Sequence, residues 1–207
     1  GHAMHSYFSN EAQNFLDSRY RIFVAEVAST TNEVLLMEYM LKNAKDNKER
    51  AYLLNHYMDS FKGTVFRQTM FAEFEKTSNE MAESGEPLTH ENLTELYLNL
   101  NKKYYGEAMI SDDLIGYEWM RIPHFYYNFY VYQYATGFSA AVAIANRVLK
   151  EGETAVSDYM KFLSSGCTKD PVSLLRIAGV DMATKEPINS ALQVFERVIE
   201  EMEELTK

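Results

Sequence analysis

The sequence is poor in several residues that would point to other classes of protein. It contains one cysteine, Cys167, so no internal disulfide can form and a reducing, cytoplasmic location is expected. Glycine (9) and proline (4) are scarce, which disfavours a disordered chain or a β protein with many turns. No apolar run approaches the roughly 20 residues that a membrane helix needs, and no signal segment is evident.

Positive charge is also in short supply. Lysine and arginine number 20 against 30 aspartates and glutamates, and the formal net charge is −10. Nucleic acids and anionic membranes both require a basic surface, so neither is expected as a partner. What the chain does have is apolar mass: 46% of its residues are hydrophobic, with 15 tyrosines and 12 phenylalanines. This composition and length are typical of a compact, mostly helical protein.

Apolar residues recur mainly at helical spacing, and the sequence predicts an all-α, multi-helical bundle in one domain, residues 1–207. Two helix starts carry local signals: Thr89 is a candidate N-cap, and Asp170 with Pro171 has the cap-then-proline arrangement. Residues 107–119 are expected to be irregular. The predicted helices span residues 3–17, 18–43, 50–84, 89–105, 125–149, 153–164 and 187–205, and a further helix starts at Pro171.

A possible metal site occupies the first helices. Zinc peptidases of the HExxH type bind zinc through two histidines one helical turn apart, and the glutamate between them is the general base. In one branch of these enzymes the third ligand is a glutamate on the next helix. Here His2 could be the second histidine and Glu26, 24 residues later, the third ligand. On spacing alone, such residues are also typical of solvent-exposed side chains or of leftover cloning sequence.

Supporting residues follow the candidate ligands at helical intervals. Ser29 and Glu33 come three and seven residues after Glu26 and therefore share its helix face. We expect them, together with His5, to support the ligands without binding the metal themselves.

The segment HFYYNFYVYQY holds five tyrosines and is expected to begin a buried helix. On such a helix, Tyr127 and Tyr134 would face the same way, with His124 one turn earlier. A tyrosine hydroxyl or a histidine N–H can donate to negative charge that develops on a carbonyl oxygen. The alternative is that the tyrosines are buried bulk with satisfied hydroxyls, which we favour for Tyr126, Tyr130 and Tyr132.

Five motifs in order resemble the oligoendopeptidase F family of thimet-oligopeptidase-like zinc metallopeptidases. They are GHAMHSYFS, FVAEVASTTNE, FRQTMFAEF, HFYYNFYVYQYATG and the segment of residues 165–182 that ends in IAGVDM. The resemblance covers essentially the whole chain. It implies that His2 and Glu26 are zinc ligands, and that His124, Tyr127 and Tyr134 bind substrate and stabilise the tetrahedral intermediate.

The resemblance also implies an incomplete site. In the family the motif reads H-E-x-G-H, so the first zinc histidine and the general-base glutamate would stand just before Gly1. We therefore expect the C-terminal part of a zinc metalloendopeptidase that hydrolyses short oligopeptides, inactive alone. Its partners would be short peptides and the missing N-terminal portion of the enzyme, with homo-oligomers possible through exposed apolar surface. The competing hypothesis is a non-catalytic helical interaction module or a split-enzyme subunit.

Overall fold

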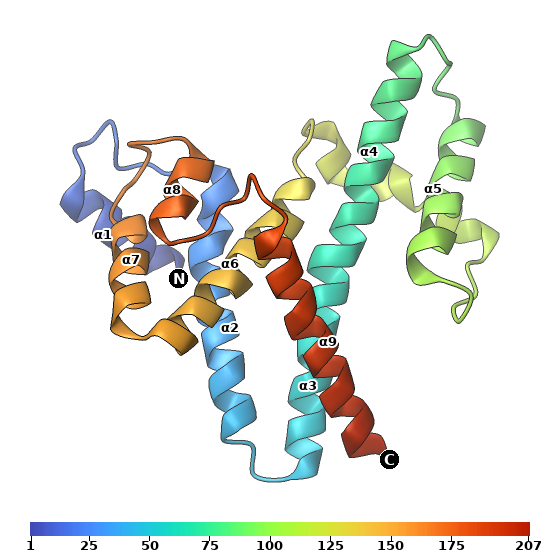
Figure 1. Cartoon of the computed structure of the whole chain (residues 1–207). Coiled ribbons are helices and arrows are strands. Elements are labelled where there is room, and N and C mark those ends of the chain that lie inside the picture. Colours follow the sequence, from blue (N-terminus) through green and yellow to red (C-terminus); the bar gives the residue numbers. More distant parts are fainter. The chain divides into compact units, whose positions relative to one another are not determined.

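The computed structural model describes residues 1–207 and is all-α, as the sequence predicts (Figure 1). A π-helical turn spans Lys62–Phe66, and 3-10 segments span Asp113–Arg121 and Pro123–Tyr126. Each helix is either too short or too polar to cross a lipid bilayer. The α-helices are α1 His2–Ala12, α2 Ile22–Lys42, α3 Asn47–Phe61, α4 Arg67–Glu83, α5 His90–Tyr105, α6 Tyr132–Glu151, α7 Glu153–Leu163, α8 Pro171–Ile177 and α9 Glu186–Thr206.

The chain forms two compact units. The first unit consists of residues 1–61 and 136–207, and the second unit consists of residues 62–135. Each unit has its own cluster of buried apolar side chains. The assignment of all 207 residues to one domain stays a prediction.

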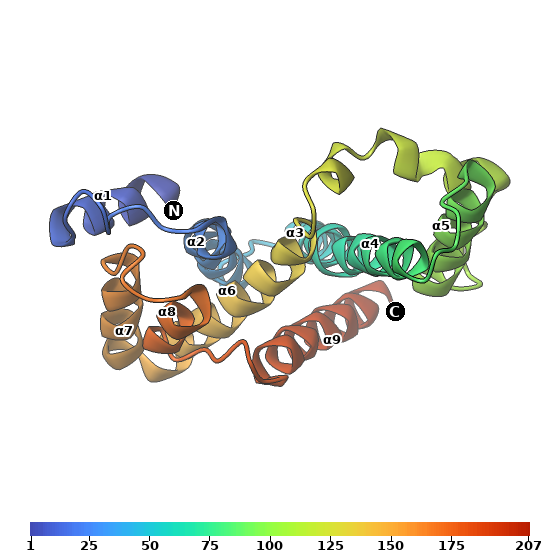
Figure 2. The ribbon, with the colours of Figure 1, turned by 90° about the horizontal axis from the view of Figure 1, so that it is seen from above.

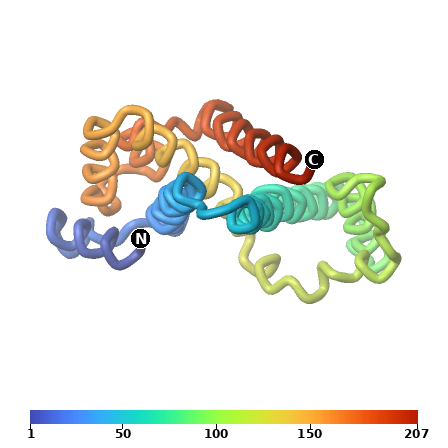
Figure 3. The backbone as a smooth tube through the Cα atoms, turned by 90° about the horizontal axis from the view of Figure 1, so that it is seen from below, coloured from blue at the N-terminus to red at the C-terminus, as the bar shows by residue number.

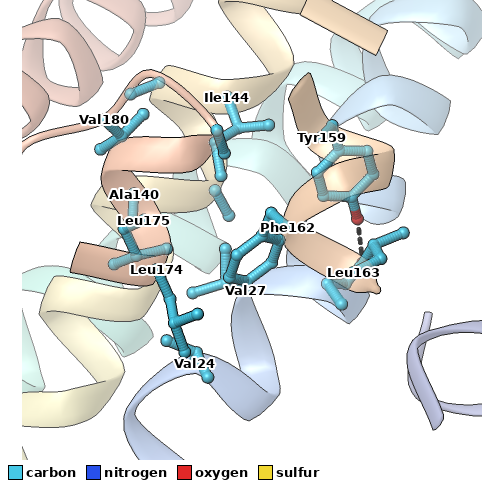
Figure 4. Close-up of a cluster of buried hydrophobic side chains, with 14 residues drawn as sticks. Val24, Val27, Ala140, Ile144, Tyr159, Phe162, Leu163, Leu174, Leu175 and Val180 are labelled. Atoms are coloured by element: carbon cyan, nitrogen blue, oxygen red, sulfur yellow. Dashed lines mark hydrogen bonds between the residues drawn. The ribbon is translucent and has the colours of Figure 1, made fainter. Parts of the chain in front are cut away.

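The core of the first unit lies between α2, α6, α7 and α8 (Figure 4). Residues 137–145 of α6 are all buried and include four alanines. These small side chains let the neighbouring helices approach α6 closely. Phe162 and Leu175 fill the space between the helices, and both are almost fully buried. The hydroxyl of Tyr159 donates to the carbonyl of Ala28 at 3.1 Å, which ties α7 to α2.

Helices α3 and α9 of the first unit lie side by side (Figure 1). Their contact contains Phe61 and Phe195, whose ring centroids are 5.0 Å apart. Arg50 Nη2 of α3 also lies 2.5 Å from Glu201 Oε2 of α9, and Arg197 of α9 contacts Glu38 of α2.

Helix α1 packs against α2 and α7 (Figure 2). It ends five residues earlier than predicted because the Asn14 side chain forms a turn, accepting from the backbone N–H groups of Leu16 and Asp17 at 2.8 and 3.1 Å. The turn is fixed to the segment after α7 by a hydrogen bond from Cys167 N–H to the Asp17 carbonyl, 2.8 Å. Gly166 must be glycine here, because its φ is +52° and a Cβ would lie 1.9 Å from the Asp17 oxygen.

The second unit packs α5 against α4 and against the 3-10 segment Asp113–Arg121. Phe71, Phe74 and Tyr97 form its aromatic core. Beside them the buried carboxylate of Glu118 accepts from Tyr97 Oη and from Arg67 Nη2, both at 2.6 Å. Tyr97 and Arg67 thereby satisfy a charge that burial would otherwise make costly.

The structure agrees with the predicted N-caps and differs from some of the predicted helix bounds. Thr89 Oγ1 accepts from Asn92 N–H at 3.3 Å, and Asp170 accepts from Ser173 N–H at 2.9 Å, so both predicted N-caps are confirmed. The helical stretch predicted over residues 50–84 is confirmed, because α3, the π-helical turn Lys62–Phe66 and α4 follow one another without a gap. The helix predicted over residues 125–149 is wrong only at its start, because α6 begins at Tyr132. The chain before α6 follows an irregular path (Figure 3).

Candidate active site

The two predicted metal ligands meet in the first unit. His2 opens α1 and Glu26 lies in the second turn of α2, and His2 Nε2 is 3.3 Å from Glu26 Oε2. Both side chains are about half exposed (52% and 51%), so the pair faces outward, away from the core. The packing of α1 on α2 thus brings the two residues together, and their role as metal ligands stays a prediction.

A glycine makes this close approach possible. A Cβ on Gly1 would lie 2.2 Å from the Cα of Ser29 and 2.8 Å from the carbonyl oxygen of Ala28. Any side chain at this position would force the start of α1 away from the backbone of α2. Gly1 thus sets the distance between the two helices on which His2 and Glu26 stand.

The predicted supporting residues of α2 contact each other. Ser29 Oγ donates to Glu33 Oε1 at 3.4 Å, within the expected face of the helix. Glu33 is exposed, and no hydrogen bond joins it to Glu26 or His2. Its role in orienting a metal ligand stays a prediction.

His5 lies in the interior of the first unit. It is 1% exposed, and its ring stacks on Tyr20 with centroids 3.6 Å apart, with Phe162 at 5.5 Å. Its Nδ1 has no hydrogen-bond partner. Burial, and to a lesser extent the nearby His2, lower the pKa of His5 to about 4, so the ring is neutral at physiological pH. The prediction that His5 supports a ligand remains untested, and its visible contacts are those of a core residue.

The donor set fits part of a zinc site. Two ligands each about 2.1 Å from a tetrahedral ion lie roughly 3.4 Å apart, which is close to the distance between His2 Nε2 and Glu26 Oε2. An imidazole nitrogen and a carboxylate oxygen are both ordinary zinc ligands. However, no cluster of three or more histidine, cysteine, aspartate or glutamate side chains forms anywhere in residues 1–207. The chain therefore offers two candidate ligands, fewer than a zinc site needs.

The predicted transition-state residues lie in the second unit, on a segment that we call the tyrosine segment, residues 124–134. It is not the expected helix. Pro123 starts a 3-10 turn that ends at Tyr126, and Phe129 adopts a left-handed φ of +55°. The argument that Tyr127 and Tyr134 share a helix face is therefore wrong, because the backbone between them is irregular.

His124 and Tyr134 nevertheless meet. A hydrogen bond of 3.3 Å joins Tyr134 Oη and His124 Nε2, and the two rings meet edge to face with centroids 5.8 Å apart. Tyr130 completes the group, with its centroid 5.7 Å from His124 and 5.6 Å from Tyr134. Tyr127 lies at the margin, 67% exposed and 6.3 Å from Tyr130.

Two neighbouring tyrosines differ from expectation. Tyr126 is 84% exposed and Tyr132 is 41% exposed, so the interpretation of both as buried bulk is wrong. Tyr130 is half-buried among the other rings. The candidate metal ligands and the tyrosine segment belong to different units.

Sequence reasoning missed a buried carboxylate, Glu75. Its Oε1 accepts a hydrogen bond from the backbone N–H of Phe129 at 2.6 Å, inside the tyrosine segment. A signal existed: Glu75 follows Phe71 by four residues and so lies on the apolar face of α4, where a carboxylate is unusual.

The chain is similar along its whole length to known oligopeptidases. The chain is 57% identical over 205 residues to oligopeptidase PepF of Bacillus subtilis and 48% identical over 207 residues to the plasmid oligoendopeptidase F of Lactococcus lactis subsp. cremoris. These alignments cover 99% and 100% of the chain but 31% and 34% of the relatives. The chain thus spans about a third of the length of the curated relatives it matches.

Solved structures show the same fold. The crystal structure of oligoendopeptidase-F from Enterococcus faecium superimposes with a TM-score of 0.90 at 50% identity, covering 100% of this chain and 37% of that one. A putative peptidase from Chlamydophila abortus gives 0.93 at 47% identity, covering 99% and 34%. The family model for peptidase family M3 matches residues 1–194. The resemblance to the oligoendopeptidases F is confirmed, and this chain belongs to peptidase family M3.

Proposed function

We propose that this chain is the C-terminal catalytic portion of a zinc metalloendopeptidase that hydrolyses short oligopeptides. The observation that carries the proposal is the contact between His2 Nε2 and Glu26 Oε2 at 3.3 Å, on helices held together at Gly1. Membership of family M3 supports a peptidase, and the names of the relatives support oligopeptide substrates.

His2 and Glu26 would each donate one atom to the metal. A bound zinc ion supplies a Lewis acid that polarises the scissile carbonyl and activates water. Since residues 1–207 contain no third clustered ligand, we propose that another histidine and the general-base glutamate come from outside these residues. On this account the chain is inactive alone.

The tyrosine segment would act on the substrate. Tyr134 Oη and His124 Nε2 can donate hydrogen bonds without a permanent charge, which suits a carbonyl oxygen that becomes negative during hydrolysis. Tyr127, largely exposed, would contact the bound peptide. Loss of one such donor typically lowers kcat by about 10²–10³-fold.

Exposed apolar side chains suggest where the rest of the enzyme binds. Phe15 and Leu16 between α1 and α2 are 80% and 82% exposed, and Leu36 and Tyr39 of α2 are 57% and 66% exposed. Apolar surface of this kind is typical of an interface. We propose that the N-terminal portion covers it, with self-association as the alternative when that portion is absent. The cytoplasmic location stays a prediction from the single cysteine.

Reconstitution tests the proposal. We expect no hydrolysis of short quenched peptides by this chain alone, and activity after the N-terminal portion of the enzyme is added. In the reconstituted protein, His2→Ala and Glu26→Gln should abolish activity, whereas His56→Gln, an exposed histidine of α3, should not. Robust hydrolysis by the isolated chain would contradict the proposal.

The competing function is a non-catalytic helical interaction module. It would be favoured by the lack of a three-ligand cluster within residues 1–207. A complex with the N-terminal portion that binds no zinc and cleaves no peptide would support it. The codons directly before Gly1 give a second test, because the proposal expects them to encode His-Glu and one further residue.

A further inference from the structure

Glu75 is a buried carboxylate whose position demands an explanation. It lies on α4 in the second unit, is 5% exposed, and forms no ion pair. Burial raises its pKa above the ordinary value, and the hydrogen bond from Phe129 N–H opposes that rise. A buried carboxylate without a counter-charge is costly unless hydrogen bonds satisfy it. The visible partner of the side chain is the backbone of the tyrosine segment.

The partner residue is conformationally unusual. Phe129 has a φ of +55°, in the left-handed region that bulky residues rarely occupy. Its own side chain is 51% exposed, so packing of the ring does not account for this conformation. A residue in such a region persists when its surroundings hold it there. Two hydrogen bonds act on it: Tyr130 N–H donates to the Tyr127 carbonyl at 3.0 Å and closes the turn, and Phe129 N–H donates to Glu75 at 2.6 Å and ties the turn to α4.

The rest of the segment is anchored to the same core on either side of this bond. Phe125 packs against Phe74 with ring centroids 5.0 Å apart, and Val131 is fully buried in the cluster that contains both. His124 lies directly before the first anchor and Tyr134 three residues after the second. The path between the anchors therefore decides whether these two side chains meet.

We propose that Glu75 is a positioning residue: by binding the N–H of Phe129 it fixes the turn that brings His124 and Tyr134 together. The importance of this turn for catalysis rests on the proposed function. The turn itself does not, and it can be tested in the chain alone.

The first test measures the turn. Glu75→Met removes the acceptor at similar size, and Glu75→Gln keeps an oxygen that can accept. In Glu75→Met we expect hydrogen exchange at the Phe129 amide, and chymotryptic cleavage after Tyr126 and Tyr127, to rise about tenfold, since a bond to a charged acceptor is lost. Glu75→Gln should restore both rates to within about threefold of the wild type.

A neighbouring glutamate provides the matched control. Glu73 of α4 accepts from Lys103 Nζ at 2.6 Å and from Tyr104 Oη at 2.8 Å, and so ties α4 to α5 without touching the tyrosine segment. Glu73→Met should leave cleavage in the segment unchanged. If Glu75→Met does not fold, hydrogen exchange in the wild-type chain still tests the proposal. Exchange of the Phe129 amide at the rate of an unstructured peptide would overturn it.

The second test uses the reconstituted peptidase. Glu75→Met should lower kcat by about 10²-fold with little change in KM, because the donors are misplaced and the metal ligands are not. Glu75→Gln should recover most of the rate. Full activity in Glu75→Met alongside an opened turn would overturn the positioning role. An inactive wild-type complex with the turn intact would instead count against the proposed function.

Discussion

The two parts of the candidate site are built in different ways. His2 and Glu26 stand on two regular helices whose separation is set by one glycine, so their contact follows from helix geometry. His124 and Tyr134 stand on either side of an irregular turn that depends on a carboxylate 54 residues earlier in the chain. Ligand spacing on helices is therefore visible in a sequence, whereas the geometry of the tyrosine segment is not.

The largest effect on stability should come from removing Phe162, on which the helices that carry His2 and Glu26 pack. Phe162 is 1% exposed and packs against His5 of α1. Phe162→Ala leaves a cavity, and we expect the free energy of unfolding to fall by about 3–5 kcal/mol in urea titrations. Phe15→Ala, at an 80% exposed position, should change it by less than about 0.5 kcal/mol. Equal effects of the two substitutions would show that α1 does not rest on this core.

His5 gives the helical half a pH dependence. Its folded pKa of about 4 lies below the ordinary value of 6.5, so between these values the unfolded chain binds a proton that the folded chain does not. Stability is fully present above pH 6.5 and is lost as the pH falls toward 4, by up to about 1.4 kcal/mol per unit.

The variant His5→Phe keeps an aromatic ring at this position and removes the group that titrates. Urea titrations at pH 5, 6 and 7 should show a shallower dependence in His5→Phe than in the wild type, because the titrating group is gone. His56→Gln should keep the wild-type slope, since His56 is exposed. Identical slopes for His5→Phe and the wild type would mean that His5 titrates normally.

Substitutions of Phe129 in the tyrosine segment should change the stability by a smaller amount. With φ at +55°, Phe129 lies where glycine has no penalty and alanine has one of about 1 kcal/mol. Phe129→Gly should therefore be more stable than Phe129→Ala by about that amount in thermal unfolding. A more stable alanine variant would show that the turn is not left-handed.

Part of this structure could be predicted because its causes are local. Thr89 and Asp170 begin helices through their own side chains, and the face shared by Glu26 and Ser29 follows from helical periodicity. The early end of α1 also has a local cause, the turn formed by the Asn14 side chain. An asparagine inside a helical pattern is not enough to predict such a turn.

The rest depends on contacts between distant residues. Nothing in the run HFYYNFYVYQY indicates that Phe129 adopts a left-handed conformation, since the acceptor of its N–H is Glu75 on α4. The burial of His5 likewise depends on Tyr20 and Phe162, which the chain brings together only on folding. The aromatic composition of the segment predicted that Tyr126 is buried, whereas the structure shows it exposed.

The central claim is that His2 and Glu26 bind one metal ion together. Titration of this chain with Zn²⁺, followed through the imidazole NMR signals of the five histidines, tests it most directly. The account predicts that the His2 signals respond first, and that Glu26→Gln weakens zinc binding at least about tenfold whereas Glu11→Gln, an exposed glutamate of α1, does not. Zinc binding that is unchanged in Glu26→Gln, or that perturbs His56 and His90 as strongly as His2, would contradict it.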